Sequence, residues 1–128
     1  MINFFEYITL ALYLPRDLGD LSGFGSRLES EGLTRDDIRM IIPDVTLKRR
    51  LAAGEDSLRV EEVDALVRLL RVVSQARAVF GDAALADEWL RSANPALGGG
   101  VPIRMARTDL GGREVEAVLG RIAHGVFG

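Results

Sequence analysis

Cysteine is absent from this 128-residue sequence, and histidine occurs once, as His124. The missing thiols exclude disulfide bonds, thiolate zinc sites and thiol nucleophiles. A single histidine cannot supply a histidine-based zinc site, and a zinc site built from carboxylates alone is unusual. The sequence therefore predicts a chain with no metal, no cofactor and no catalysed reaction.

A strong charge bias and a long apolar run are also missing. Lys and Arg total 16 against 19 Asp and Glu, which gives a formal net charge of −3, so any nucleic-acid surface must be a local patch. The apolar segment at residues 2–14 carries Glu6, lacks a basic flank and is too short to span a bilayer. We therefore expect a cytoplasmic protein without a signal peptide or membrane anchor.

The sequence does contain clear helical periodicity. The longest helix is predicted at residues 59–80, where apolar residues recur with helical spacing. Gly81 ends this helix, and no segment of the chain requires a strand. We therefore predict an all-α fold. The residues that carry the i, i+3, i+4, i+7 pattern are Val63, Leu66, Val67 and Leu70.

Two short helices are predicted ahead of the long one. The first begins after Thr34, which can form a capping box with Asp37, and stops before Pro43. The second starts within residues 44–46 and closes at Gly54 in the left-handed conformation. The short turn between the two helices has helix-turn-helix spacing.

The second of these helices carries a run of cations. Leu47 and Leu51 are expected to face inward, and Lys48, Arg49 and Arg50 to point elsewhere. These cations are either surface charge on an amphipathic helix or the phosphate contacts of a recognition helix. Both interpretations stay open from the sequence.

The C-terminal half is built from capped helices and stops. Asp82 is predicted to cap a helix over residues 84–92, and Asn94-Pro95 to stop it. Trp89 is expected in the core, packed under the turn at residues 94–101. One face of this helix is expected to hold Ala86, Trp89, Leu90 and Ala93.

A second capped helix ends this half. Gly98–Gly100 is predicted to be a flexible turn, and Pro102 to open one more helical turn. Thr108 or Asp109 then caps the last helix, which Gly125 ends. Gly120 inside that helix is expected to mark close approach of another backbone. The apolar stripe of the last helix is Val115, Val118, Leu119 and Ile122.

This order of parts resembles the MbcA/ParS/Xre antitoxin family over about residues 14–127. The matching C-terminal residues are Trp89-Leu90, Asn94-Pro95-Ala96-Leu97-Gly98-Gly99, Pro102, Thr108, Gly111, Val115, Leu119-Gly120-Arg121-Ile122 and Gly125-Val126-Phe127. Those of the Xre-like part are Leu33, Thr46-Leu47, Arg49-Arg50 and Glu61-Glu62. Members often have a Leu-rich segment where this chain has Ile103–Arg107.

The resemblance implies an antitoxin of a type II toxin–antitoxin pair whose toxin is a RES-domain protein, similar to ADP-ribosyltransferases and using NAD. It implies a toxin-binding domain at residues 58–128 that blocks the toxin's active site. It also implies an Xre-like region at residues 1–57 that serves dimerisation and, in many members, binding to the operator. The alternative is a stand-alone helix-turn-helix DNA-binding regulator.

Site residues follow from the resemblance and from the charges. We expect DNA contacts from Lys48, Arg49 and Arg50. The arginines between Glu88 and Asp109, where no acid occurs, form either a solvated face or a surface for an acidic partner. The Val126-Phe127 tail either docks on its own fold or plugs a cleft. The expected toxin-binding residues are Arg91, Asn94, Arg104, Arg107, Arg121, His124, Val126 and Phe127.

Overall fold

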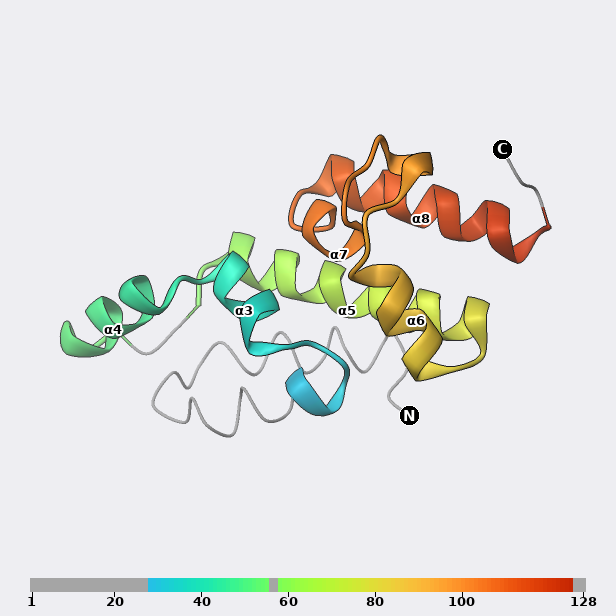
Figure 1. Ribbon diagram of the computed structural model, residues 1–128. Coiled ribbons are helices and arrows are strands. Elements are labelled where there is room, and N and C mark those ends of the chain that lie inside the picture. Colours follow the sequence, from blue (N-terminus) through green and yellow to red (C-terminus); the bar gives the residue numbers. More distant parts are fainter. Residues whose placement is uncertain (1–27, 56–57, 126–128) are drawn as a thin grey trace. The chain divides into compact units, whose positions relative to one another are not determined.

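The structure is a computed structural model that describes residues 28–55 and 58–125 of the 128. The regular elements within these ranges are all helices (Figure 1), which confirms the all-α prediction. One isolated β-bridge joins Asn94 to Gly100. The expectations for residues 1–27 and for Val126 and Phe127 lie outside the described residues.

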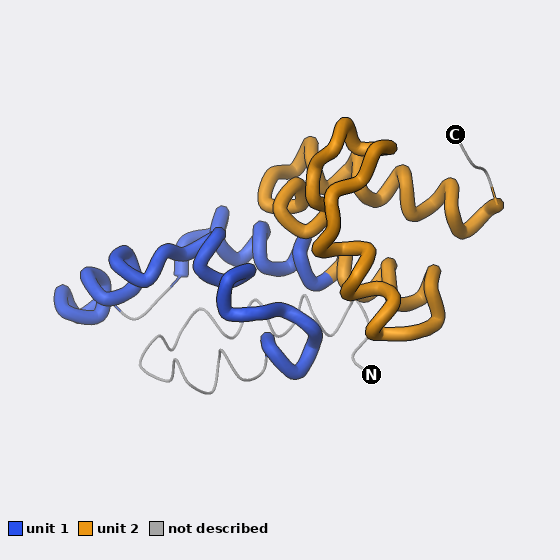
Figure 2. Tube along the Cα trace, viewed as in Figure 1, with its two compact units in different colours: residues 1–70 blue, residues 71–128 orange. Residues whose placement is uncertain are grey.

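The chain divides into two compact units, residues 1–70 and residues 71–128 (Figure 2). The division falls inside α5 (Val60–Phe80), so that this helix contributes its first half to unit 1 and its second half to unit 2. The observed bounds of α5 agree with the predicted long helix to within one residue. A functional boundary between residues 57 and 58 stays a prediction, because compactness does not show which residues bind a partner.

Unit 1 contains the two predicted short helices, α3 (Arg35–Ile41) and α4 (Asp44–Ala52). Thr34 and Asp37 form the predicted capping box: the Thr34 N–H donates to Asp37 Oδ2 at 2.7 Å, and the Asp37 N–H donates to Thr34 Oγ1 at 3.2 Å. Gly54 follows α4 with a φ of 78°, in the left-handed region that glycine favours.

The inward face of α4 differs from the prediction. Leu51 is 37% exposed and Leu47 is half-buried, whereas Arg50 is 5% exposed. The reason is a carboxylate that the periodicity of α4 does not reveal: Glu62, in the first turn of α5, binds the Arg50 guanidinium. A paired arginine can occupy an interior position that the apolar pattern assigns to leucine.

Unit 2 begins with the second half of α5, which ends before Gly81. The next helix is α6 (Ala83–Leu90), and the Asp82 side chain caps it as predicted by accepting from the Leu85 N–H at 2.9 Å. The helix ends earlier than expected, so that Ala93 lies beyond it and is exposed. Asn94 opens the next element instead of stopping α6.

The remaining elements of unit 2 are η3 (Pro95–Leu97), α7 (Pro102–Met105) and α8 (Asp109–Ala123). Pro102 occupies the first position of α7 as predicted. Thr108 is the cap of α8, and its side chain accepts from the Gly111 N–H at 3.0 Å. α7 contacts both α6 and α8, and α8 also contacts η3. The segment between α6 and α8 is therefore held in place by contacts with both of these helices.

The core of unit 2 draws on each of its α-helices, whereas η3 contributes no buried residue. Val115, Val118 and Leu119 of the predicted α8 stripe are buried, and Ile122 is half-buried. The Arg71 side chain of α5 forms an ion pair with Glu116 of α8, and Gln75 donates to the Glu116 carbonyl at 3.4 Å. The other buried residues of this unit are Val72, Val73, Ala76, Ala86, Leu90, Pro102, Ile103, Ala106 and Gly112.

Candidate functional site

The turn after α6 is closed by hydrogen bonds instead of being flexible as predicted. The Asn94 N–H donates to the Gly100 carbonyl at 3.0 Å, and the Gly99 N–H donates to the Asn94 carbonyl at 2.9 Å. The Asn94 side chain also accepts from the Ala96 N–H at 2.9 Å. Gly98 and Gly99 have φ angles of 65° and 86°, a region in which a side chain would be strained. The glycines therefore define one turn conformation.

Met105, at the end of α7, packs between two glycines. A Cβ on Gly100 would lie 3.1 Å from the Met105 Cγ and closer still to its Sδ. A Cβ on Gly111 would lie 2.8 Å from the Met105 carbonyl carbon and closer still to its oxygen. Both glycines therefore permit a close approach that no other residue would allow without movement.

Gly120 does not have the role predicted for it. Apart from the two chain neighbours and the backbone of the same helix, no described atom lies within 4 Å of a Cβ built at this position. The close approach of backbones that we expected here occurs at Gly111 instead, one turn into α8. Helical spacing alone could not show which of the two glycines another backbone approaches, because that depends on where α7 packs against α8.

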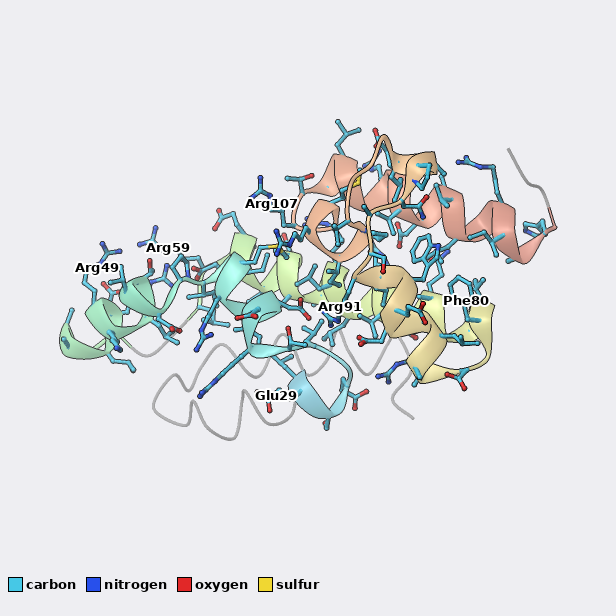
Figure 3. All side chains as sticks on the ribbon, viewed as in Figure 1. Glu29, Arg49, Arg59, Phe80, Arg91 and Arg107 are labelled. Atoms are coloured by element: carbon cyan, nitrogen blue, oxygen red, sulfur yellow. The ribbon has the colours of Figure 1, made fainter. Side chains whose placement is uncertain are left out.

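A cationic surface with one apolar residue surrounds the junction of α7 and α8. Arg104 and Arg107 are exposed, and Leu110 is 71% exposed. Figure 3 shows Arg107 projecting away from this junction. The charge of nearby Arg113 is opposed by Asp109, to which it pairs at 3.0 Å. We call Arg104, Arg107 and Leu110 the junction surface.

The other predicted toxin-binding residues are placed differently. Arg91 is 26% exposed and pairs with Asp87 of α6 at 2.7 Å. Asn94 shapes the turn, as described above. Arg121 and His124 are exposed at the C-terminal end of α8. The structure therefore brings Arg104 and Arg107 together, and places Arg121 and His124 at the other end of α8.

Trp89 is half-buried and contributes to a surface hollow as well as to packing. Its ring lies 5.8 Å from that of Phe80, centroid to centroid, at an interplanar angle of 44°. An open pocket of about 340 Å³ lies beside this pair, between residues of α6 and the turn that follows it. Leu85, 54% exposed, is part of its lining. The pocket is apolar in its larger part.

The cations of α4 separate into exposed and buried groups. Lys48 and Arg49 are exposed, whereas the Arg50 guanidinium donates to both carboxylate oxygens of Glu62 at 2.6 and 2.8 Å. The Arg59 N–H donates to the same carboxylate at 2.7 Å. Arg50 therefore takes part in an internal contact, and Lys48 and Arg49 remain as the surface cations of this helix.

The charges in this contact reinforce each other. Burial alone would raise the pKa of Glu62, but the hydrogen bonds from Arg50 and the Arg59 N–H, with the positive charge of both arginines, hold that pKa below its ordinary value. The hydrogen bond to Glu62 raises the pKa of Arg50, which burial opposes and the charges of Glu62 and Glu55 support. Both groups are therefore ionised at neutral pH.

Among the described residues, no three Asp, Glu or His side chains gather closely enough to hold a metal ion. Within the same ranges, none of the helices is both long and apolar enough to cross a membrane.

Sequence reasoning missed Leu110 and the Gly111–Met105 contact. Leu110 could have been found, because it lies off the Val115–Leu119 stripe by roughly a third of a helical turn. An apolar side chain that is off the buried face of an amphipathic helix is expected to be exposed. The Gly111 contact had no such signal, because it depends on a backbone carbonyl of another element.

The C-terminal half of the chain is similar to known proteins. The family model described as the antitoxin Xre/MbcA/ParS C-terminal toxin-binding domain matches residues 75–125. The antitoxin Xre of Pseudomonas putida is 39% identical over 85 residues, which are 66% of this chain and 53% of that protein. The chain thus spans about half the length of this curated relative. Both matches are to antitoxins of the same kind, and residues 75–125 are similar to the toxin-binding domain of the MbcA/ParS/Xre antitoxins.

Proposed function

We propose that this chain is an antitoxin that binds a cognate toxin through unit 2 and neutralises it. The proposal rests on one observation: the residues that match a toxin-binding domain include an exposed surface, and hydrogen bonds hold the backbone that carries it. Residues 75–125 match a toxin-binding domain, and the junction surface of Arg104, Arg107 and Leu110 lies within them. An exposed leucine beside two arginines has the composition of a protein interface, in which arginine is enriched.

The contacts divide into anchoring and shaping residues. Arg104, Arg107 and Leu110 meet an acidic surface of the toxin that has an apolar recess. Arg121 and His124 add contacts from the other end of α8. Arg91 and Asn94 support the surface through Asp87 and the turn. The Val126-Phe127 tail plugs the cleft of the toxin, and burial of such apolar side chains contributes about 1.5–3 kcal/mol each.

The toxin partner is a RES-domain protein, by the resemblance described above. Such toxins resemble ADP-ribosyltransferases and use NAD, so the antitoxin acts by covering the NAD-binding cleft. The chain catalyses no reaction in this role, and its place is the cytoplasm, where NAD is available to the toxin. It acts as a homodimer within a larger toxin–antitoxin complex.

A tagged pull-down from the native host tests the proposal. We expect a protein that co-purifies in near-equal amount and that consumes NAD only after this chain has been removed. Adding the purified chain back should restore the inhibition in proportion to the amount added. Recovery of the chain alone, or an NAD-consuming partner that this chain does not inhibit, would contradict the antitoxin function.

A second function, operator binding, is favoured by the exposed cations of α4. Lys48 and Arg49 lie on the second helix of a pair joined by a short turn, and Figure 3 shows Arg49 projecting from α4. In a homodimer two such helices meet the DNA, which offsets the net negative charge of the chain. The antitoxin thereby regulates its own operon; the alternative is a regulator that has no toxin partner.

Fluorescence anisotropy with the chain's own promoter fragment, at several salt concentrations, tests operator binding. Phosphate contacts predict an affinity that falls steeply with salt, and Lys48→Gln with Arg49→Gln should reduce both the affinity and its salt dependence. Binding that is insensitive to these substitutions would remove α4 from the DNA interface. Recovery of the chain on this DNA without any toxin would favour the stand-alone regulator.

A further inference from the structure

We propose that Gly111 is a positioning residue for the junction surface. It lets the carbonyl of Met105 lie against the first turn of α8, and this contact sets how Arg104 on α7 is placed relative to Leu110 on α8. The inference rests on the proposed function, in which these side chains contact the toxin.

Two hydrogen bonds from Thr108 hold the Met105 carbonyl oxygen. It accepts from the Thr108 N–H at 3.3 Å and from Thr108 Oγ1 at 3.4 Å. The same Thr108 Oγ1 accepts from the Gly111 N–H at 3.0 Å, which caps α8. A shift of the carbonyl away from Gly111 would therefore strain the cap of α8 as well as the end of α7.

A side chain at position 111 has nowhere to go. Its Cβ would overlap the Met105 carbonyl oxygen and lie 3.0 Å from Thr108 Oγ1. Backbone atoms cannot rotate away as side-chain atoms can, so the two helices must separate. Because Arg104 is on one of these helices and Leu110 is on the other, their separation changes the spacing of the surface.

Two other glycines supply graded comparisons. At Gly100 the nearest obstacle is the Met105 side chain, which has three rotatable bonds and can take a new rotamer. The Leu97 carbonyl oxygen, 3.2 Å from the added Cβ, would have to move by a few tenths of an ångström. At Gly120 an added Cβ comes within 4 Å of no described atom beyond its two chain neighbours and the backbone of its own helix. The expected order of effect on the junction surface is therefore Gly111→Ala, then Gly100→Ala, then Gly120→Ala.

The experiment combines these variants with charge reversal in a double-mutant cycle. Toxin affinity is measured by calorimetric titration of the full chain with the purified partner toxin. We expect Gly111→Ala to weaken binding about tenfold or more, and the Arg104→Glu/Arg107→Glu pair to weaken it strongly in the wild-type background. In the Gly111→Ala background the same pair should add little, because the arginines are already misplaced.

Thr108→Val and Thr108→Ser keep the experiment informative if Gly111→Ala does not fold. Valine removes the hydroxyl that links Met105 to Gly111 at nearly constant volume, and should also lower the affinity and shrink the added effect of charge reversal. Serine restores the hydroxyl and should recover both. Recovery by serine is not expected if position 108 only fills space.

Amide NMR spectra of the chain alone separate this inference from the function on which it rests. Gly111→Ala should move the resonances of residues 104–107 and leave those of α6 in place. Unchanged resonances, wild-type affinity, or a full additional loss from charge reversal in the Gly111→Ala background would each overturn the role of Gly111. A wild-type chain that binds no toxin, with the resonances moved as expected, would overturn the antitoxin function and confirm only the contact.

Discussion

The Arg50 guanidinium joins α4 to the start of α5 in unit 1 through Glu62. Arg50 is 5% exposed and the Glu62 side chain 13%, so both charges are largely removed from water. Burial of an ion pair costs desolvation that the attraction offsets only when the geometry is good. Here the bidentate contact and the additional Arg59 N–H satisfy both carboxylate oxygens.

This contact predicts a loss of stability in acid. Because the folded pKa of Glu62 lies below its ordinary value of 4.5, its contribution is present above that pH and is lost as the pH falls through the folded pKa. We expect Arg50→Met to lower the free energy of unfolding by about 3 kcal/mol at neutral pH, because it removes the ion-pair partner of the largely buried Glu62 carboxylate. The difference in free energy of unfolding between Arg50→Met and the wild type should become smaller as the pH falls and Glu62 becomes protonated.

Urea unfolding of both proteins between pH 3 and 7 measures this difference, at pH values roughly bracketing the titration of a carboxyl group. Arg49→Met is the matched control, because it removes the same charge from the exposed side of the same helix. A difference that is constant with pH, or an equal loss in Arg49→Met, would contradict the internal role of Arg50.

Charge reversal separates the two proposed binding surfaces. Arg104→Glu with Arg107→Glu should weaken toxin binding, since reversed charges meet an acidic surface, and should leave DNA binding unchanged. Lys48→Glu with Arg49→Glu introduces the same change in charge on unit 1 and should do the opposite. Titrations of the wild type and both double variants with the toxin and with the promoter fragment make the comparison. Toxin affinity that survives the reversal at positions 104 and 107 would exclude the junction surface.

Among the elements, α8 is a helix whose interior glycine can be replaced. Gly120 has no left-handed φ, and no described atom counted as a neighbour lies within 4 Å of its added Cβ. Gly120→Ala should therefore raise the free energy of unfolding by up to about 1 kcal/mol, because alanine loses less backbone entropy in a helix. Thermal unfolding checks the result, and a destabilised variant would show that a neighbour approaches this position after all.

The elements themselves were largely predictable, because their boundaries are local. Thr34, Asp82 and Thr108 cap their helices with their own side chains, and such caps are short-range chemistry. The early end of α6 was not predictable in this way. Asn94-Pro95 indicates that the helix cannot continue past this point. In the structure Asn94 is the N-cap of η3, and residues 91–93, between the end of α6 and this cap, are not helical.

At the scale of the whole molecule, two truncations separate folding from inhibition. Removing the residues after Ile122 also removes two hydrogen bonds at the end of α8. The His124 N–H donates to the Gly120 carbonyl at 3.1 Å, and the Gly125 N–H donates to the Ile122 carbonyl at 3.1 Å. That variant should fold less well and neutralise the toxin poorly. Truncation after Gly125 keeps both bonds and removes only the tail.

The NAD consumption of the toxin, measured against the amount of each truncated chain, distinguishes these effects. We expect truncation after Gly125 to weaken inhibition, because the proposed apolar plug is lost while both hydrogen bonds at the end of α8 are kept. Full inhibition by this shorter chain would remove the tail from the mechanism and leave the junction surface to account for it.

The sequence by itself determined the helical class, the helix caps, the turn glycines and the family resemblance, because each depends on residues close together in the chain. Only the tertiary structure decided which of the α4 cations are exposed and which glycine is required. Arg50 is internal because Glu62, from another helix, binds it. Gly111 is required because the Met105 carbonyl lies against it, whereas no such atom lies against Gly120 in the part of the chain that the structure describes. Both outcomes depend on contacts between elements, which helical periodicity within one element does not encode.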